Sequence, residues 1–446
     1  PENISDSIDL GSASTGATAT YDLSDLAALA DGFSVIRIGH ITTGTHAISM
    51  QGFNGGAALR DDLVIHAPAG AGQITLLDST DTGNNDLTFD GVFSAGAASL
   101  TIDSGTSGQL TFGDDAGFGA NDVALVGNVF ADFLGAITGS GTLLIQPTTN
   151  ATAIDVGDVV GAGGTLQGGL VVSQADLQIL NDADFTAIEI GIATTGTHSI
   201  QLGATTGATA WNSDVVFHAP AGAGLITVLG SQLVDTTGNA NATGDMTFDG
   251  DVVIGNPVTI TVEDLLTFEQ GLDIDGNNST LASGDLDFNG GANSVVNTGA
   301  AATLTLSSAS SAADIDIGDL GANARPGAWS LADAELGAID ASIGSLAFGT
   351  PTTGSHSMFI GLITAMNFNA TFNAPLGEIR LHDNITAVGA DMVGRALVFN
   401  GDVRIANTAT PTVSTDGAAG DADITFNFDI FGSLTGAGET LALDAD

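Results

Sequence analysis

One set of motifs occurs three times along the chain in the same order. The longest reads Gly-His-Ile-Thr-Thr-Gly-Thr-His in its first copy, and its copies span residues 39–46, 191–198 and 349–356. Three further motifs recur with it, at 8–11, 154–157 and 315–318; at 66–72, 218–224 and 373–378; and at 87–91, 246–250 and 397–401. Chance does not produce four motifs in one order three times. The chain therefore consists of three tandem repeats, at 1–146, 147–307 and 308–446.

Each repeat is a series of short runs in which apolar and polar residues alternate. Ile, Val, Leu, Thr and Phe fill these runs, and Gly, Asn, Asp and Ser separate them. Alternation with a period of two indicates strands with one face buried. In the first repeat we expect strands at 34–39, 46–50, 62–66, 73–77, 86–89, 99–102, 109–112, 123–126 and 142–145. Phe89, Phe248 and Phe399 occupy the same place in the three repeats, as a stacked interior ladder requires.

Two all-β architectures fit this spacing. A β-solenoid stacks successive coils so that equivalent strands pair in parallel, whereas an array of β-sandwich domains needs antiparallel hairpins. Hairpin turns of the Asn-Gly type are few, at 289–290 and 400–401, and the other connections are Gly/Asn/Ser corners of variable length. The sequence therefore favours a β-solenoid, with the sandwich array as the alternative.

One segment in each repeat breaks the strand pattern. Residues 23–33, 173–185 and 331–343 carry Leu at a spacing of three to four, with Ser or Asp near the start. This pattern predicts a short helix. A structural corner is the simpler interpretation of each helix, and a partner-binding helix is the other.

The charge of the chain excludes several partners. Asp and Glu number 52 against 6 basic residues, all of them arginine, which gives a net charge of -46. Nucleic acid and anionic membrane surfaces both require a cationic footprint, so neither is an expected partner. The mutual repulsion of such surfaces is relieved by salt or divalent cations, which suits saline surroundings.

Other classes of protein are excluded by what the sequence lacks. Cysteine is absent, so neither disulfides nor thiolate metal sites hold this fold. No run of 18 apolar residues occurs, and the start shows no basic region followed by an apolar one. We therefore expect neither a transmembrane helix, nor membrane insertion, nor a signal peptide in the sequence as given.

The two ends of the sequence match the internal boundaries between repeats. Residues 1–11 align without a gap on 147–157, and residues 440–446 resemble 142–148. This predicts a whole number of repeats, which continue into further repeats or associate head to tail with other copies. The expected partner is then the chain itself.

The repeats resemble those of giant bacterial surface adhesins. The resemblance lies in the segments 153–158, 176–180, 190–200 and 246–254, and includes filamentous-haemagglutinin-like β-helix proteins. It extends over essentially the whole chain by pattern. It implies a right-handed parallel β-helix, a location at the cell surface, and a role in adhesion, a surface filament or a biofilm.

Recurring histidines offer one candidate site. His46 and His66 in the first repeat match His198 and His218 in the second, and each pair is 20 residues apart. Stacked on neighbouring coils, the two imidazoles could share a metal ion. The alternative is that they hydrogen-bond within a repeated corner. The third repeat favours the alternative, because it has Asn373 at the second place, and an amide is a poor zinc ligand.

Calcium is the one cofactor that the sequence suggests. Asp273, Asp275 and Asn277 supply oxygen ligands at alternate positions, as a hard cation requires. The helix–loop–helix calcium motif would need Glu at position 284, which is Gly, and the glycine-rich nonapeptide of β-rolls is absent. We therefore give these three residues as a candidate metal site only.

Catalysis has little support in the sequence. Carboxylate pairs abound, but only Trp211, Trp329 and Tyr21 could join Phe in a cleft of aromatic subsites. No sequence fingerprint of a hydrolase nucleophile, a zinc protease or a nucleotide site is present. The sequence thus predicts a non-enzymatic extracellular structural protein, with an adhesin module that binds a surface glycan as the alternative.

Overall fold

The computed structural model describes residues 6–445, apart from 12–16, 18, 22–24, 26–31, 54–60, 182, 311–312, 326–327, 353–354, 365, 389–392, 407–409, 421 and 433–439. The helix expected over 23–33 lies largely outside the described residues, as does Arg60. By contacts, the chain forms two compact units. Unit 1 comprises residues 1–225 and 234–243, and unit 2 comprises 226–233 and 244–446.

Unit 1 is built almost entirely of short strands. Its largest sheet contains β1 (Ile8–Leu10), β2 (Ala19–Tyr21), β3 (Ile36–Gly39), β4 (Ala47–Met50), β5 (Leu63–Ala67), β6 (Gln73–Leu76), β8 (Leu87–Ala95), β10 (Leu110–Phe112), β11 (Ala116–Gly119), β13 (Asp132–Phe133) and β14 (Ile137–Gly139). A second group is β7 (Thr80–Asp81), β9 (Ser99–Asp103), β12 (Asp122–Val126), β15 (Thr142–Gln146), β18 (Ala187–Gly191) and β20 (Asp214–Ala219). A third is β16 (Ile154–Val156), β17 (Leu170–Val172) and β19 (Ser199–Leu202).

Unit 2 repeats this construction. One group contains β24 (Val252–Ile254), β27 (Leu272–Asp273) and β30 (Val295–Val296), and another contains β23 (Met246–Gly250), β26 (Leu265–Phe268) and β29 (Asp285–Phe288). The largest contains β25 (Thr259–Val262), β28 (Ser279–Ser283), β31 (Thr303–Ser308), β32 (Ile315–Ile317), β33 (Trp329–Leu331), β34 (Ser345–Phe348), β35 (Met358–Ile360), β36 (Asn369–Leu381), β38 (Leu397–Ile405), β40 (Ile424–Phe426) and β41 (Ile430–Phe431). The last is β37 (Ile385–Thr386), β39 (Thr412–Ser414) and β42 (Ala442–Asp444). Strands β21 (Leu225–Val228) and β22 (Gln232–Val234) contain the positions at which the two units divide.

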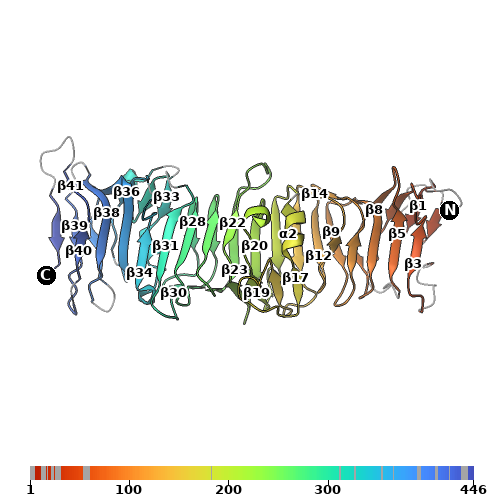
Figure 1. Cartoon of the computed structure of the whole chain (residues 1–446), viewed down its shortest axis with the longest axis horizontal. Coiled ribbons are helices and arrows are strands. Elements are labelled where there is room, and N and C mark those ends of the chain that lie inside the picture. The colour runs from red at the N-terminus through yellow and green to blue at the C-terminus, as the bar shows by residue number, and fades with distance from the viewer. Residues whose placement is uncertain are drawn as a thin grey trace. The chain divides into compact units, whose positions relative to one another are not determined.

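The strands within each unit pair in parallel. Leu63 pairs with Leu87 and Leu87 with Leu110, and antiparallel contact among the described residues is confined to single bridges such as Asp158–Ala204. Strands that pair are mostly not consecutive in the chain, since β3 pairs with β5 and β4 with β6. The colours of Figure 1 nevertheless follow one another in chain order along each unit. The all-β class and the expected strands are confirmed, and antiparallel hairpins of the sandwich alternative do not occur in these pairings.

The stretch of chain from one strand to the next strand that pairs with it is called a layer here. Layers differ in length: His66 and Asp90 are 24 residues apart, whereas Asn373 and Asn400 are 27 apart. Where one sequence repeat follows another, the layer is longer and carries a helix, α2 (Gln174–Asn181) in unit 1 and α3 (Asp333–Leu336) in unit 2. The short helices expected over 173–185 and 331–343 are thus confirmed. Short 3-10 turns complete the fold, η1 (Gly207–Thr209), η2 (Gly321–Asn323) and η3 (Ala341–Ile343).

Parallel pairing stacks like residues on like in the interior. The rings of Phe348, Phe372, Phe399 and Phe426 in unit 2 follow one another at 5.3, 5.1 and 4.8 Å between centroids. These distances match the spacing of about 4.8 Å between neighbouring strands. Phe89, Phe248 and Phe399 are each fully buried, which confirms the expected ladder position.

A recurring glycine permits the close approach of neighbouring layers. Gly39, Gly191 and Gly349 have φ angles of 98°, 107° and 74°, which favour glycine. A Cβ on Gly39 would lie 2.1 Å from the carbonyl oxygen of His66, and one on Gly191 would lie 2.2 Å from that of His218. The repeat of this glycine in the sequence therefore has a steric cause.

Candidate functional site

Three of the recurring sequence motifs meet in one column of stacked layers. Gly39, from the first motif, pairs with His66, from the second, and His66 pairs with Asp90, from the third. In the third repeat, Asn373 and Asn400 are paired in the same way. The motifs are far apart in the sequence, but each supplies one position of the same corner.

Hydrogen bonds along this column differ from repeat to repeat. The Nδ1 of His66 lies 2.6 Å from Oδ2 of Asp90, and its Nε2 lies 3.3 Å from the Arg37 guanidinium. In the third repeat, Nδ2 of Asn400 donates to Oδ1 of Asn373 at 2.9 Å. Asn427 donates in turn to Asn400, so the amides form a ladder. An amide can replace the imidazole because the column requires a hydrogen bond between layers and not a particular ring.

The histidine of the first motif is buried at the same corner. His46, His198 and His356 are at most 2% exposed. Nε2 of His198 lies 2.6 Å from the main-chain oxygen of His218, and Nε2 of His356 lies 2.7 Å from that of Asn373. A carbonyl oxygen accepts, so these nitrogens carry the proton and are not free to bind a metal. Burial lowers the pKa of His198, against hydrogen bonds to the main-chain oxygens of His218 and Asn150.

These contacts support the corner interpretation of the recurring histidines. Among the described residues, no group of three or more His, Cys, Asp or Glu side chains is arranged to hold a metal ion. The imidazoles join layers through hydrogen bonds instead.

The structure places the three candidate calcium ligands at the end of β27 and in the turn that follows it. Asp273 Oδ1 accepts from the main-chain nitrogens of Asp275 and Thr298, at 2.8 and 3.0 Å, and Oδ2 accepts from the Thr298 hydroxyl at 2.5 Å. Asn277 donates through Nδ2 to the main-chain oxygens of Ile254 and Asp275. Hydrogen bonds thus engage both carboxylate oxygens of Asp273, and calcium at Asp273, Asp275 and Asn277 stays a prediction.

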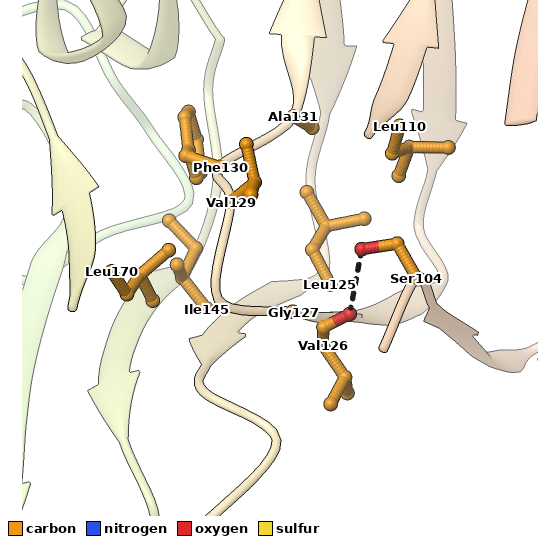
Figure 2. A pocket seen from close by; sticks show the side chains of 10 residues that line it. All are labelled: Ser104, Leu110, Leu125, Val126, Gly127, Val129, Phe130, Ala131, Ile145 and Leu170. Atoms are coloured by element: carbon orange, nitrogen blue, oxygen red, sulfur yellow. Dashed lines mark hydrogen bonds between the residues drawn. The ribbon is translucent and has the colours of Figure 1, made fainter. Parts of the chain in front are cut away.

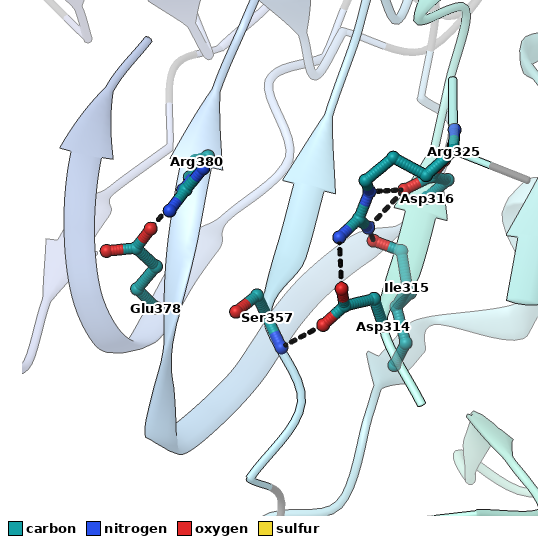
Figure 3. A network of polar contacts seen from close by, with 7 residues as sticks. All are labelled: Asp314, Ile315, Asp316, Arg325, Ser357, Glu378 and Arg380. Carbon is teal, nitrogen blue, oxygen red and sulfur yellow. Dashed lines mark hydrogen bonds and ion pairs between the residues drawn. The ribbon is translucent and has the colours of Figure 1, made fainter. Parts of the chain in front are cut away.

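Unit 2 contains an ionic network that the sequence motifs do not reveal. Arg325 binds Asp314 at 2.5 Å and also Asp316, and its guanidinium lies 3.1 Å from the centre of the Phe359 ring. Figure 3 shows Asp314 also accepting from the main-chain nitrogen of Ser357, at 2.9 Å. Arg325 is on the loop after β32, so these contacts join a loop to two strands.

The same network continues along the paired strands. Phe359 pairs with Arg380, and Arg380 pairs with Arg404 in the next layer. Glu378 contacts both arginines, with Arg404 Nε at 3.0 Å from its Oε2. Burial by itself raises the pKa of Glu378, but hydrogen bonds from Arg404 and Arg380 bring it below the usual value. Three of the six basic residues of the chain, Arg325, Arg380 and Arg404, therefore belong to this network in unit 2.

Two carboxyl groups share a hydrogen bond at the start of α3. Burial, followed by the neighbouring Asp287 and Asp285, raises the pKa of Glu335 to about 7, although the Ala332 main-chain nitrogen donates to it at 2.6 Å. Burial and then Asp285 also raise the pKa of Asp287. At neutral pH a proton is thus partly retained between Glu335 and Asp287.

Unit 1 has a small cavity and a surface pocket, and Val129 and Phe130 line both of them. Figure 2 shows the cavity, lined by Leu125, Ile145 and Leu170 on one side and by Val129 and Phe130 on the other. It measures about 10 Å³, which is room for one water molecule at most. The surface pocket also contacts Val129 and Phe130 and measures about 340 Å³, so it can admit a ligand.

Comparison with known proteins finds no similar protein. No family model matches the chain, and no curated protein and no solved structure matches it. Within the part of the chain that the structure describes, no helix is long and apolar enough to cross a membrane.

Proposed function

We propose that the chain is an extracellular structural protein, a repeat section or protomer of a cell-surface filament or adhesin stalk. The observation that carries the proposal is the parallel, in-register pairing of layer after layer inside each unit. Among the described residues, the recurring motifs supply interior and corner contacts between layers, and the proposal includes no catalytic activity. A screen for turnover of polysaccharides tests that last point.

The proposed architecture is a right-handed parallel β-helix. Parallel strands joined by crossovers in one sheet are right-handed in about 98% of proteins. The stacked phenylalanines and the asparagine ladder are also what repeated parallel layers produce. An experimental structure of the full chain tests the proposal, and left-handed coils would contradict it.

The joints between sequence repeats suggest how further copies would add. At the joint in unit 1, Leu143 of β15 pairs with Ile188 of β18, and in unit 2 Leu304 of β31 pairs with Leu346 of β34. The run at 440–444 resembles 142–146, so its strand β42 is similar in pattern to the joint strand β15. We propose that this strand pairs in the same way with a further repeat or with a second copy.

Electron microscopy and sedimentation of the purified chain test head-to-tail association. Filaments or short oligomers are expected, and they should lengthen as salt or Ca²⁺ screens the net charge of -46. The substitution Leu443→Lys, at a side chain 52% exposed on β42, should shorten them, whereas Val160→Lys, 60% exposed on a loop of unit 1, should not. A chain that stays monomeric under all these conditions would contradict the proposal.

The location at the cell surface has its own test. Labelling of intact cells with an antibody against the chain is expected to succeed, because a surface filament or stalk is accessible from outside. Labelling that appears only after the cells are permeabilised would contradict an extracellular location.

A second candidate function is an adhesin module that recognises a glycan. The observation that favours it is the surface pocket of about 340 Å³ in unit 1. A glycan array probed with the full chain tests this candidate. If the chain binds no glycan on the array, the candidate is contradicted and only the structural role remains.

A further inference from the structure

A strand that borders the surface pocket of unit 1 differs between two sequence repeats. Strand β17 pairs with β16 as β33 pairs with β32, so Leu170 corresponds to Trp329. The Trp329 indole is 1% exposed, and its Nε1 donates to the Ser283 hydroxyl at 3.3 Å. The smaller Leu170 lines the small cavity of unit 1, and its neighbours Gly169 and Val171 line the surface pocket.

The acidic residues that border the pocket in unit 1 have counterparts in unit 2 with different contacts. Asp176 caps α2 through the main-chain nitrogen of Ser173, as Glu335 caps α3, and Asp132 pairs with Thr111 as Asp287 pairs with Thr267. Glu335 and Asp287 hydrogen-bond to each other. Asp132 and Asp176 instead both line the pocket.

Two amide side chains in the pocket are fixed by their neighbours. Gln109 donates through Nε2 to the main-chain oxygens of Leu110 and Phe130, at 3.0 and 2.8 Å. Asn128 accepts through Oδ1 from the nitrogen and the hydroxyl of Thr148, at 3.1 and 2.9 Å. Within the described residues, the other atoms of the two amides have no such bonds. Gln109 Oε1 is therefore an oriented acceptor, and Asn128 Nδ2 is an oriented donor.

The carboxylates add acceptors, and the wall between them is apolar. Oδ2 of Asp176 accepts both bonds from Ser173, at 2.7 and 2.6 Å, which leaves its Oδ1 for a ligand. The side chains of Val129, Phe130 and Val171 complete the lining. Val129 is 39% exposed, so its side chain is accessible to a ligand in the pocket.

We propose that this pocket binds a neutral saccharide, one or two sugar residues of a surface glycan. A sugar presents hydroxyl donors for the carboxylates and for Gln109, a hydroxyl acceptor for Asn128, and an apolar C–H face for Val129 and Val171. The volume is near the lower end of the range of about 300–1,000 Å³ for small-molecule pockets. Uronic acids and sialic acid are excluded, because Asp132 and Asp176 repel a carboxylate. The inference rests on the second candidate function and is independent of filament formation.

Saturation-transfer NMR and calorimetry on the full chain test the proposal. The probes are glucose, galactose, mannose, N-acetylglucosamine, their β-1,4 disaccharides, and glucuronic acid as the charged comparator. At least one neutral sugar is expected to bind, and glucuronic acid is expected to bind at least about tenfold more weakly. Asp132→Ala should weaken binding by about tenfold or more, and Val171→Trp should abolish it by filling the pocket.

A matched control separates a local effect from a general one. Asp402→Ala removes another exposed acidic side chain from a strand, on β38 of unit 2, and should leave binding unchanged. Thermal unfolding of each variant shows whether it is folded. No binding by any neutral sugar, unchanged binding by Asp132→Ala, or binding of Ca²⁺ alone that Asp132→Ala removes would each overturn the proposal. Filaments seen by microscopy beside a failed sugar test would leave the structural role standing.

Discussion

Nδ1 of His66 lies 2.6 Å from Oδ2 of Asp90, one layer further along the chain. The two residues come from different motifs, 24 positions apart, and the third repeat places Asn373 and Asn400 in the same relationship. A hydrogen bond between layers thus persists although both of its side chains change. The first and third repeats thus use different residue types at this position for the same contact between layers.

The first prediction exchanges one version of this bond for the other. His66→Asn leaves Asp90 without its imidazole partner and should lower the free energy of unfolding by about 1 kcal/mol. The double variant His66→Asn with Asp90→Asn recreates the amide pair of the third repeat and should recover most of that loss. Urea denaturation of the four proteins in a double-mutant cycle measures the coupling. Additive effects of the two substitutions on the free energy of unfolding would contradict the coupling between His66 and Asp90.

The second prediction concerns the recurring glycine. Gly191→Ala should lower the free energy of unfolding by about 2 kcal/mol or more, because its Cβ would lie 2.2 Å from the His218 carbonyl oxygen. Gly168→Ala is the matched control, since Gly168 also has a positive φ of 75° but no atom within 4 Å of the added Cβ. The control should cost about 1 kcal/mol. Equal losses in urea denaturation would show that the close approach is unimportant.

The third prediction is a dependence of stability on pH. The pKa of Glu335 rises from 4.5 in the unfolded chain to about 7 in the folded one. The folded state therefore binds more protons than the unfolded chain between these two pH values. The stability that the raised pKa of Glu335 gives the folded state is thus complete below pH 4.5 and is lost as the pH rises through about 7. Glu335→Gln should remove it, so the difference in unfolding free energy between wild type and variant should change over this range. A constant difference for Glu335→Gln would refute the shared proton.

The fourth prediction concerns the ionic network of unit 2. Arg325→Met leaves Asp316, whose side chain is 6% exposed, without its cation, and should lower the free energy of unfolding by about 3 kcal/mol. Arg37→Met is the control, because Arg37 is exposed and makes one side-chain hydrogen bond within the described residues, to His66. Its cost should be about 0.5 kcal/mol or less. Chemical denaturation measures both, and similar costs would mean that the network adds little.

Much of the fold was predictable because its signals are local. Alternation of apolar and polar residues fixed the strands, such as 99–102 and 142–145, and leucine spacing with an acidic cap fixed the helix within 173–185. Recurrence identified Phe89, Phe248 and Phe399 as interior residues. The candidate calcium ligands are close together in the sequence, so their proximity was also predictable, but the hydrogen bonds that engage Asp273 were not.

The sequence by itself determined the threefold repeat, the all-β class and the residues that face the interior, since each depends on spacing along a short stretch of chain. The tertiary structure decided which motifs meet. Layer lengths vary from 20 residues between Asp122 and Thr142 to 46 between Ser140 and Thr186, so no fixed period identifies the partners. The column of His66 and Asp90, the Arg325 network and the pocket beside Asp132 depend on that register. They depend on contacts between layers, which only the folded chain brings together.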